Sequence, residues 1–315
     1  MKETIYISDC DHENIDIEKK IIEEGNLSLK LLQCKSEEDV IENCRDAKVL
    51  INQYAPITKK VIESLPQLKL VVRYGVGVNN VDIISATENN VQVCNVPDYG
   101  MNEVADHALA LMLSLTRKIV KMDKITRSGK WDYTESIPLY RHSEQTVGVI
   151  GVGRIGRAFI SKVQALGCNV IAYDKYFNGE IPGVKMVSFE DLIRSSDVIS
   201  IHCPSDNAMN LIGEKELKEM KKGCYLINVS RGGIINEEAL YKALRGNYIG
   251  GAALDVVLKE PLEKTSPLFT LDNFICTPHM AWYSEEAAKE LKRKVAEESV
   301  RFLKGEKVHY AVNKL

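Results

Sequence analysis

The stretch from Thr146 to Asp174 constrains the fold of this chain more than any other part of the sequence. It begins with a short apolar run, Val147 to Ile150, and continues with glycines in the pattern Gly-x-Gly-x-x-Gly. An amphipathic segment follows and ends at Gly167, and a second apolar run, Val170 to Tyr173, closes on Asp174. In order, the stretch predicts a buried strand, a glycine turn, a helix, a second strand and an acidic residue.

Each of these parts is suited to holding a dinucleotide. Gly151 allows a sharp turn, Gly153 lets backbone approach a pyrophosphate, and Gly156 lets helix and strand pack closely. The pyrophosphate would lie on free N–H groups at the helix N-terminus, where the dipole favours an anion. Asp174 can accept hydrogen bonds from both ribose hydroxyls and would repel a 2′-phosphate, which favours NAD over NADP. Similar glycine turns also occur as structural connections, so the prediction depends on the flanking strand, helix and acid.

Composition sets the broad class of the protein. The chain has 315 residues, enough for about two domains, and 45% hydrophobic residues can build their cores. The formal net charge is −3 and Lys and Arg form no dense run, so neither nucleic acid nor membrane is an expected partner. The N-terminal sequence lacks an apolar segment of signal-peptide length, and the longest apolar stretch is too short to span a bilayer. We therefore expect a cytoplasmic protein.

The cysteines favour buried, reduced thiols. All 8 are scattered without CxxC pairs, and several lie in apolar, strand-like runs, so disulfides and metal ligands are not expected. His12, close to Asp9, Cys10 and Asp11, suggests a metal site at first sight. A solvated loop after the first strand is the better interpretation, and we predict no metal.

The first hundred residues alternate between strand-like and helical patterns, which indicates a parallel sheet with helices on both faces. We expect strands at 4–7, 27–32, 49–51, 70–72 and 91–93, and helices at 15–24, 36–44 and 58–65. A long helix is expected at 102–120, joining two domains. The irregular arm at 128–143 carries Trp131, Tyr133 and Tyr140, which either cover the core or dock onto a second subunit.

The alternation resumes after Asp174. We expect helices at 188–194, 214–220 and 236–244, and strands at 198–202, 225–229, 252–256 and 274–276. With the opening stretch these form a second doubly wound sheet, with ligands at the carboxyl ends of its strands. A last helix, from Ser284 to about Leu303, could return to pack on the first domain. The predicted fold class is therefore α/β, with two doubly wound parallel-sheet domains.

Three polar residues near strand ends in the second half suit hydride exchange with a 2-oxo acid: Arg231, Glu260 and His279. Arginine offers a planar fork to a carboxylate and a carbonyl oxygen. Histidine titrates near neutrality and can protonate that oxygen, and a neighbouring glutamate would hold the ring in its protonated form. Singly, each has an ordinary interpretation, as a turn arginine, a solvated carboxylate or a loop histidine.

The sequence resembles the D-isomer-specific 2-hydroxyacid dehydrogenases over nearly its whole length. The matching motifs are RYGVGVNNVD, VADHALALML, GVIGVGRIGR followed by YD, ISIHCPS, LINVSRGG, GAALDVVLKEP and CTPHMAW. The resemblance implies a flavodoxin-like substrate domain made of residues 1–101 and 287–315, and a Rossmann NAD-binding domain inserted at 102–286. It also implies a homodimer built largely through the NAD-binding domains, and an active site between the domains.

The resemblance also implies a set of site residues. Arg231 would clamp the substrate, Glu260 would partner His279, and His279 would be the acid/base. Arg73, Val76, Gly77, Arg231 and Trp282 would bind the substrate, although from the residues alone the glycine turn after Arg73 is either an anion nest or a plain strand–helix turn. The cofactor residues would be Gly151, Gly153, Arg154, Ile155, Gly156, Asp174, Cys203, Pro204, Val229, Ser230, Arg231, Asp255 and His279.

Within the family, the segment from His279 to Glu285 looks like the C-terminal-binding-protein branch, and Trp282 stands where phosphoglycerate dehydrogenases usually carry small residues. Tyr54 is either a pocket wall or a packed loop residue. We expect an NAD-dependent enzyme that interconverts a small 2-oxo acid and a D-2-hydroxy acid. The alternative is an NAD(H)-sensing binding protein, as the resemblance to co-repressors allows.

Overall fold

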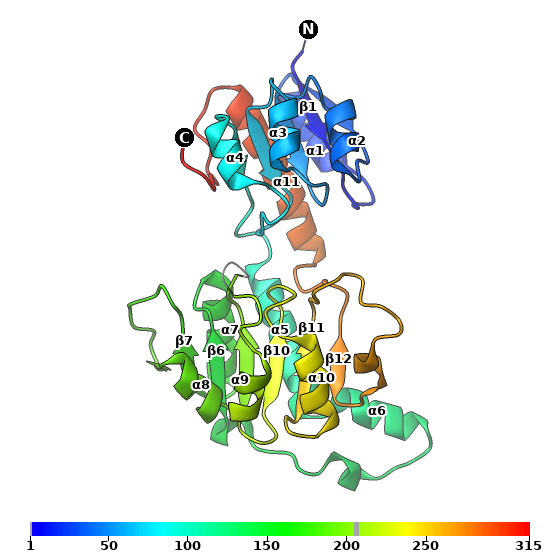
Figure 1. Cartoon of the computed structure of the whole chain (residues 1–315), viewed down its shortest axis with the longest axis vertical. Helices are drawn as coiled ribbons and strands as arrows, with labels where there is room; N and C mark the ends of the chain where they lie inside the picture. Colours follow the sequence, from blue (N-terminus) through cyan, green and yellow to red (C-terminus); the bar gives the residue numbers. More distant parts are fainter. Residues whose placement is uncertain (1, 205–207) are drawn as a thin grey trace. The chain divides into compact units, whose positions relative to one another are not determined.

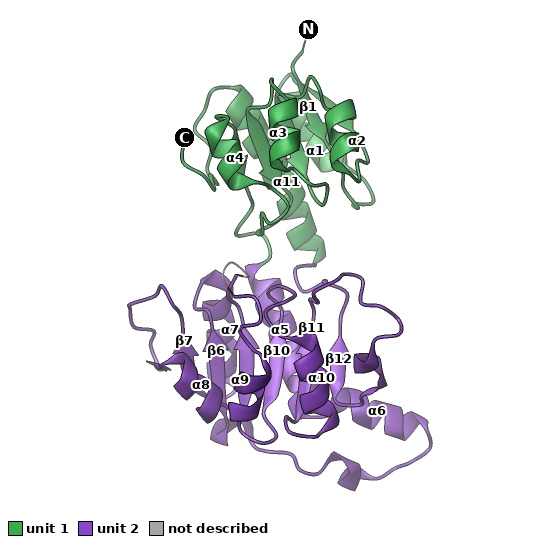
Figure 2. Ribbon diagram, in the orientation of Figure 1, with its two compact units in different colours: residues 1–100, 284–315 green, residues 101–283 purple. Residues whose placement is uncertain are grey.

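The computed structural model describes residues 2–204 and 208–315. The chain divides into two compact units, the first made of residues 1–100 and 284–315 and the second of residues 101–283 (Figure 2). Both chain ends therefore build the first unit, and the second unit is an insertion. The predicted boundaries, after residues 101 and 286, fall one and three residues further along the chain.

The first unit is built around a five-stranded parallel sheet with the order β2-β1-β3-β4-β5 (Figure 1). Its strands are β1 (Thr4–Ile7), β2 (Ser28–Leu31), β3 (Val49–Asn52), β4 (Leu70–Arg73) and β5 (Gln92–Cys94). Its helices are α1 (Asp16–Glu24), α2 (Glu37–Asn43), α3 (Lys59–Ser64), α4 (Ile83–Glu88) and α11 (Glu285–Leu303). This strand order is the flavodoxin-like one that was predicted. The short helix α4 was not predicted.

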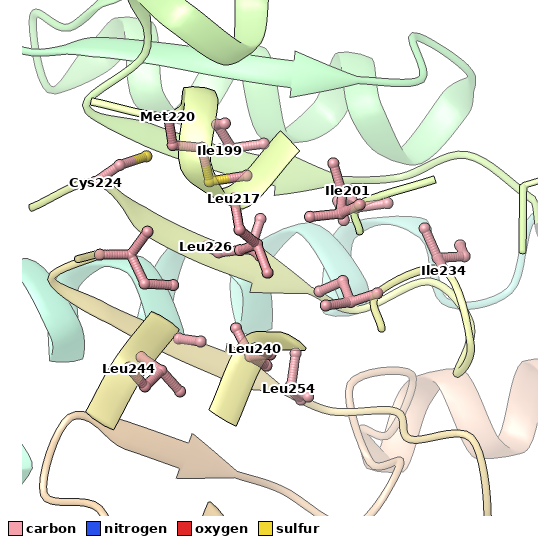
Figure 3. Close-up of a cluster of buried hydrophobic side chains, with 14 of the residues drawn as sticks. Ile199, Ile201, Leu217, Met220, Cys224, Leu226, Ile234, Leu240, Leu244 and Leu254 are labelled. Atoms are coloured by element: carbon pink, nitrogen blue, oxygen red, sulfur yellow. The ribbon is translucent and has the colours of Figure 1, made fainter. Parts of the chain in front are cut away.

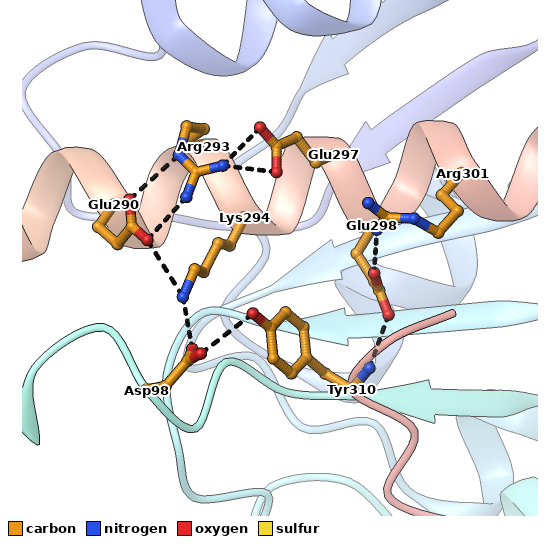
Figure 4. A network of polar contacts seen from close by, with 8 residues as sticks. All are labelled: Asp98, Glu290, Arg293, Lys294, Glu297, Glu298, Arg301 and Tyr310. Carbon is orange, nitrogen blue, oxygen red and sulfur yellow. Dashed lines mark hydrogen bonds and ion pairs between the residues drawn. The ribbon is translucent and has the colours of Figure 1, made fainter. Parts of the chain in front are cut away.

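Helix α11 packs against α1 and β4 and anchors the C-terminal tail of the first unit. The buried Glu298 carboxylate accepts the backbone N–H of Tyr310 and pairs with Arg301 (Figure 4). Lys294 donates to Asp98 at 2.7 Å, and the Tyr310 hydroxyl donates to the same carboxylate at 3.1 Å. These contacts hold the tail beside β5, where it adds an antiparallel bridge to the edge of the sheet.

The second unit contains a seven-stranded parallel sheet with the order β12-β11-β10-β9-β6-β7-β8. Its strands are β6 (Thr146–Ile150), β7 (Asn169–Tyr173), β8 (Val184–Met186), β9 (Val198–Ile201), β10 (Tyr225–Asn228), β11 (Gly251–Leu254) and β12 (Phe274–Cys276). Helices α7 (Arg154–Ala165), α8 (Phe189–Ser195), α9 (Glu214–Glu219) and α10 (Glu237–Arg245) connect them. Counted from β6, this is the Rossmann order with one further strand, which confirms the predicted fold class. Strand β8 was not predicted.

Apolar side chains pack on both faces of the second sheet. One core lies between the strands and helices α8, α9 and α10; Figure 3 labels Ile199, Ile201, Leu217, Met220, Cys224, Leu226, Ile234, Leu240, Leu244 and Leu254. The other core includes Phe159 of α7 and Met112 of the helix that opens this unit. Because both faces are covered, the strands read as continuous apolar runs in the sequence.

The expected long helix at 102–120 is wrong, since two helices occupy this region. Helix α5 (Met101–Thr116) ends before Lys118, whose φ of +54° lies in the left-handed region, and α6 (Ile119–Arg127) begins directly after it. The Thr116 hydroxyl donates to the Met112 carbonyl at 2.8 Å in the last turn of α5. The left-handed residue redirects the chain, so α6 does not continue the axis of α5.

The arm after α6 contains two short 3₁₀ helices, η1 (Tyr133–Ser136) and η2 (His142–Glu144). Trp131, Tyr133 and Tyr140 are 90%, 77% and 60% exposed. These aromatic side chains therefore do not cover the core of the chain to which they belong, and that interpretation of the arm is excluded.

The expectation of a solvated loop at His12 is also wrong. The His12 side chain is only 6% exposed, and its ring packs edge-on against Tyr74 at a centroid distance of 5.0 Å. In the described ranges no cluster of three or more His, Cys, Asp or Glu side chains is placed to hold a metal ion. The eight cysteines, all in described parts of the chain, are free thiols. No helix among the described residues is both long and apolar enough to cross a membrane.

Candidate active site

The glycine turn between β6 and α7 combines two tightly packed positions with one open position. Gly151 has a φ of +94°, and a Cβ built on it would lie 2.7 Å from the Cys203 backbone nitrogen. A Cβ on Gly156 would overlap the Gly151 carbonyl oxygen. Around Gly153, by contrast, no heavy atom of the described residues other than Gly153 itself and its two chain neighbours lies within 4 Å of an added Cβ. The space beside Gly153 at the start of α7 is therefore open, and the start of a helix is where a pyrophosphate would bind.

Asp174 follows β7 and is fixed beside this turn. Its Oδ2 accepts the Val152 N–H at 2.9 Å, and its Oδ1 accepts the N–H groups of Tyr176 at 2.8 Å and Phe177 at 3.2 Å. A carboxylate keeps spare acceptor sites after such bonds, so Asp174 can still receive ribose hydroxyl groups. Its fixed negative charge next to the turn is the feature that favours NAD over its 2′-phosphorylated form.

The turns after β9 and β10 are joined by polar contacts. The Ser230 hydroxyl donates to the Cys203 carbonyl. The buried Asn228 accepts the Ser230 N–H at 3.0 Å and donates to the Arg231 carbonyl at 2.8 Å, so it shapes the turn that carries Arg231. Sequence reasoning missed Asn228, although a polar residue at the end of an apolar strand was the available signal. The turn also presents Val229, which is buried, whereas Pro204 is exposed.

The structure brings His279 and Glu260 together. His279 Nδ1 lies 2.7 Å from Glu260 Oε2, and Glu260 Oε1 accepts the Val257 N–H at 3.2 Å. Partial burial alone raises the pKa of Glu260, but the His279 hydrogen bond and charge, the Val257 N–H and the charge of Arg231 together lower that pKa below its usual value. The carboxylate is therefore ionised near neutral pH, and His279 Nε2 remains as the ring nitrogen that can exchange a proton with a ligand.

The loop that carries His279 is held by Asp255, which is buried. The Asp255 carbonyl accepts the His279 N–H at 2.8 Å. Its carboxylate accepts the N–H groups of Met280 at 3.0 Å and Ala281 at 2.9 Å, and the Thr277 hydroxyl at 2.6 Å. Asp255 was predicted as a cofactor residue, and the structure gives its carboxylate a direct role in shaping the loop.

The remaining predicted substrate residues divide between the two units. Trp282 lies in the second unit, with its ring edge-on to Tyr283. Arg73, Val76 and Gly77 lie in the first unit, and the Arg73 guanidinium occupies the space that a Cβ on Gly75 would fill.

Tyr54, also in the first unit, is 60% exposed and donates its hydroxyl to Asp11 at 2.8 Å. It is therefore not a packed loop residue. The neighbouring backbone N–H groups of Gln53, Tyr54 and Ala55 donate to the buried Asp9 carboxylate.

Comparisons with known proteins agree on one family. Residues 109–281 match the model of the D-isomer specific 2-hydroxyacid dehydrogenase NAD-binding domain. A D-3-phosphoglycerate dehydrogenase of Archaeoglobus fulgidus is 38% identical over 88% of this chain and 53% of its own length. A glyoxylate reductase of Korarchaeum cryptofilum is 35% identical over 86% of this chain and 84% of its own length.

A solved structure of D-lactate dehydrogenase from Aquifex aeolicus, in complex with NAD and lactic acid, superposes with a TM-score of 0.88. It is 26% identical, and the match covers 96% of each chain. The chain spans 53% and 59% of the length of two phosphoglycerate dehydrogenases that it matches. By its sequence motifs, its fold and these relatives, the chain belongs to the D-isomer specific 2-hydroxyacid dehydrogenase family, and its second unit contains the NAD-binding domain of that family.

Proposed function

We propose that the protein is an NAD-dependent oxidoreductase that interconverts a small 2-oxo acid and the corresponding D-2-hydroxy acid. The observation that carries this proposal is the 2.7 Å hydrogen bond between His279 and the ionised Glu260, on loops that follow strands of an NAD-binding domain. Relatives named glyoxylate reductase, glycerate dehydrogenase and hydroxypyruvate reductase support the substrate class.

The cofactor site fits NAD. The open position at Gly153 leaves the first N–H groups of α7 accessible to a pyrophosphate, and Asp174 can receive the ribose hydroxyls. The other proposed cofactor residues are Gly151, Arg154, Ile155, Gly156, Cys203, Pro204, Val229, Ser230, Arg231, Asp255 and His279. When bound, NADH supplies the hydride.

Three side chains of this protein bind the substrate, transfer its proton and hold the proton donor in place. Arg231 binds the substrate carboxylate and carbonyl oxygen through its planar fork. His279 donates the proton on Nε2 to that oxygen in reduction and takes it back in oxidation. Glu260, whose pKa is lowered, stays ionised, fixes the ring through Nδ1 and stabilises positive charge on it.

Substrate selection is assigned to Arg73, Val76, Gly77 and Trp282. The glycine turn after Arg73 can present backbone N–H groups to a carboxylate, and the indole of Trp282 limits the size of the group at C3. Within the family, the resemblance to the C-terminal-binding-protein branch depends on the segment from His279 to Glu285, which contains Trp282.

The test is NADH oxidation by the purified protein against a panel of 2-oxo acids: glyoxylate, hydroxypyruvate, pyruvate and acids with longer apolar side chains. Saturable turnover of at least one acid is expected, with the D product. Tight NADH binding without turnover of any of them would contradict the proposal and favour an NAD(H)-sensing protein.

We also propose that two copies of the chain associate through the second unit. Exposed apolar side chains gather on α6 and the arm: Ile119, Val120, Trp131, Tyr133, Ile137 and Tyr140. Apolar surface of this kind is typical of an interface. Sedimentation should give twice the mass of one chain, and replacing both Trp131 and Tyr133 by serine should give monomers. A wild-type monomer would contradict the proposal.

Cytoplasmic location and the lack of nucleic-acid and membrane partners stay predictions.

A further inference from the structure

His107 lies on α5, whose buried positions are mostly apolar, and its partly buried side chain reaches the loop that carries His279. Its Nε2 is 2.9 Å from the Thr277 hydroxyl oxygen, which in turn lies 2.6 Å from Asp255 Oδ1. The side chain of His107 is 19% exposed and that of Asp255 is 1% exposed. His107 Nε2 also lies 3.6 Å from Asp255 Oδ1 itself, so the three polar groups form one cluster at a buried carboxylate, in which Thr277 makes the two short hydrogen bonds.

The direction of these hydrogen bonds follows from the number of protons. The Thr277 hydroxyl has a single proton, and the Asp255 carboxylate can only accept, so that proton is donated to Asp255. The Thr277 oxygen must then accept from His107, whose Nε2 carries a proton. His107 is thus a hydrogen-bond donor to Thr277, and this bond leaves the Thr277 proton directed at the Asp255 carboxylate.

Asp255 connects this cluster to the His279 loop. Its Oδ1 also accepts the Met280 N–H, its Oδ2 accepts the Ala281 N–H, and its carbonyl accepts the His279 N–H. His279 itself has a φ of +53°, a conformation that costs free energy in a residue with a Cβ and persists only where its surroundings impose it. The position of the carboxylate therefore sets the conformation from which the imidazole projects.

We infer that His107 is a positioning residue for His279, acting through Thr277 and Asp255. The His107 N–H orients the Thr277 hydroxyl toward Asp255, and Asp255 then holds the backbone on which His279 stands. This inference rests on the proposed function for its kinetic consequence, because a misplaced imidazole matters only where it transfers a proton to the substrate.

Three variants test the donor role. His107→Leu removes the donor, His107→Gln keeps an N–H near the position of Nε2, and Thr277→Val removes the relay with little change in shape. We expect kcat to fall about tenfold in His107→Leu and in Thr277→Val, with the Kd for NADH unchanged within about twofold. His107→Gln should retain kcat within about threefold of the wild type. The double variant should be no slower than either single one, because both changes break one chain of bonds.

The chain offers a control at the C-terminal end of α5, where His142 of η2 contacts Thr116 of α5. His142 Nε2 lies 3.0 Å from the Thr116 hydroxyl oxygen, and that hydroxyl donates to the Met112 carbonyl, so a histidine again bonds to a threonine hydroxyl, but no carboxylate follows. Thr116 is nine residues from His107, about 13 Å along the helix axis. His142→Leu should leave kcat unchanged.

Hydrogen exchange supplies a measurement that is independent of turnover. The amides of Met280 and Ala281 should exchange about tenfold faster in His107→Leu and Thr277→Val than in the wild type, and at the wild-type rate in His142→Leu. A wild-type kcat and wild-type exchange in His107→Leu would overturn the inference, as would a His107→Gln variant as slow as His107→Leu. If the wild type reduces no 2-oxo acid, the proposed function fails, and the exchange rates alone decide the positioning role.

Discussion

Replacing Gly153 by alanine should weaken NADH binding while leaving the fold intact. Gly153 has φ −66° and ψ −166°, which alanine adopts readily, and a Cβ there meets no heavy atom of residues 2–204 or 208–315 within 4 Å. Alanine is a poorer N-cap than glycine, which lowers the stability of the folded state. It also reduces the conformational entropy of the unfolded chain, which has the opposite effect. We expect the free energy of unfolding to change by less than about 1 kcal/mol.

The added methyl group would stand over the first N–H groups of α7, where the pyrophosphate is expected. Loss of one hydrogen bond to a charged group costs about 1.5–3 kcal/mol, which corresponds to a rise in Kd of about 10- to 100-fold. Gly156→Ala should behave differently, because its Cβ overlaps the Gly151 carbonyl oxygen and lies 3.1 Å from the carbonyl carbon. The backbone must move by roughly 1 Å, and such overpacking costs about 1–3 kcal/mol of stability.

NADH fluorescence titration gives Kd, and urea denaturation gives the free energy of unfolding. Gly213→Ala is the matched control, because Gly213 is also a helix N-cap, with φ −103°, and does not belong to the glycine turn. The control should bind NADH like the wild type. If Gly153→Ala also bound NADH with the wild-type Kd, the cofactor would not lie over this turn, and the reasoning about the site would be refuted.

Three further tests address separate parts of the structure. His279→Ala should abolish turnover with little change in the Kd for NADH, and unchanged turnover would remove His279 from the mechanism. Burial lowers the pKa of His202 to about 3, so the unfolded chain takes up the proton first and stability is lost as the pH falls below about 6.5. Between about pH 6 and 4, the free energy of unfolding of the wild type should fall by about 1 kcal/mol per pH unit more than that of His202→Leu. Urea denaturation at several pH values measures this, and an equal dependence on pH in the two proteins would count against the burial of His202. Glu298→Gln should lower the free energy of unfolding of the full chain by about 3 kcal/mol, because it breaks the buried ion pair with Arg301. Glu297→Gln, which breaks the more exposed pair with Arg293, should lower it by only about 0.5 kcal/mol. Similar losses in the two variants would show that burial does not decide the effect.

Much of the fold could be predicted from the sequence because its strands and helices have local sequence patterns. Strands buried on both faces read as short apolar runs, and every predicted strand and helix of the first unit agrees with the structure within one residue at each end. Two of the elements that were missed, α4 and β8, are only six and three residues long, and a third, α6, follows a break that the sequence does not mark. The break at Lys118 was missed because a left-handed lysine carries no local signal comparable to glycine or proline.

Candidate site residues could be proposed from the sequence only where a motif marks them. The glycine turn and Asp174 belong to one continuous stretch, whereas His107 and Thr277 are 170 residues apart, and no local pattern connects them. The same limit explains the error at His12, which Tyr74 covers from a distant strand end. Long-range packing of this kind becomes visible only in the folded chain.

Deuterium transfer tests the central claim most directly. The protein would be incubated with a 2-oxo acid and NADH deuterated at both hydrogens of nicotinamide C4, and the product would be examined by mass spectrometry and chiral chromatography. Direct hydride transfer predicts a D-2-hydroxy acid that carries one deuterium at C2. A product without deuterium, a product of L configuration, or no product from any acid of the panel would contradict the account.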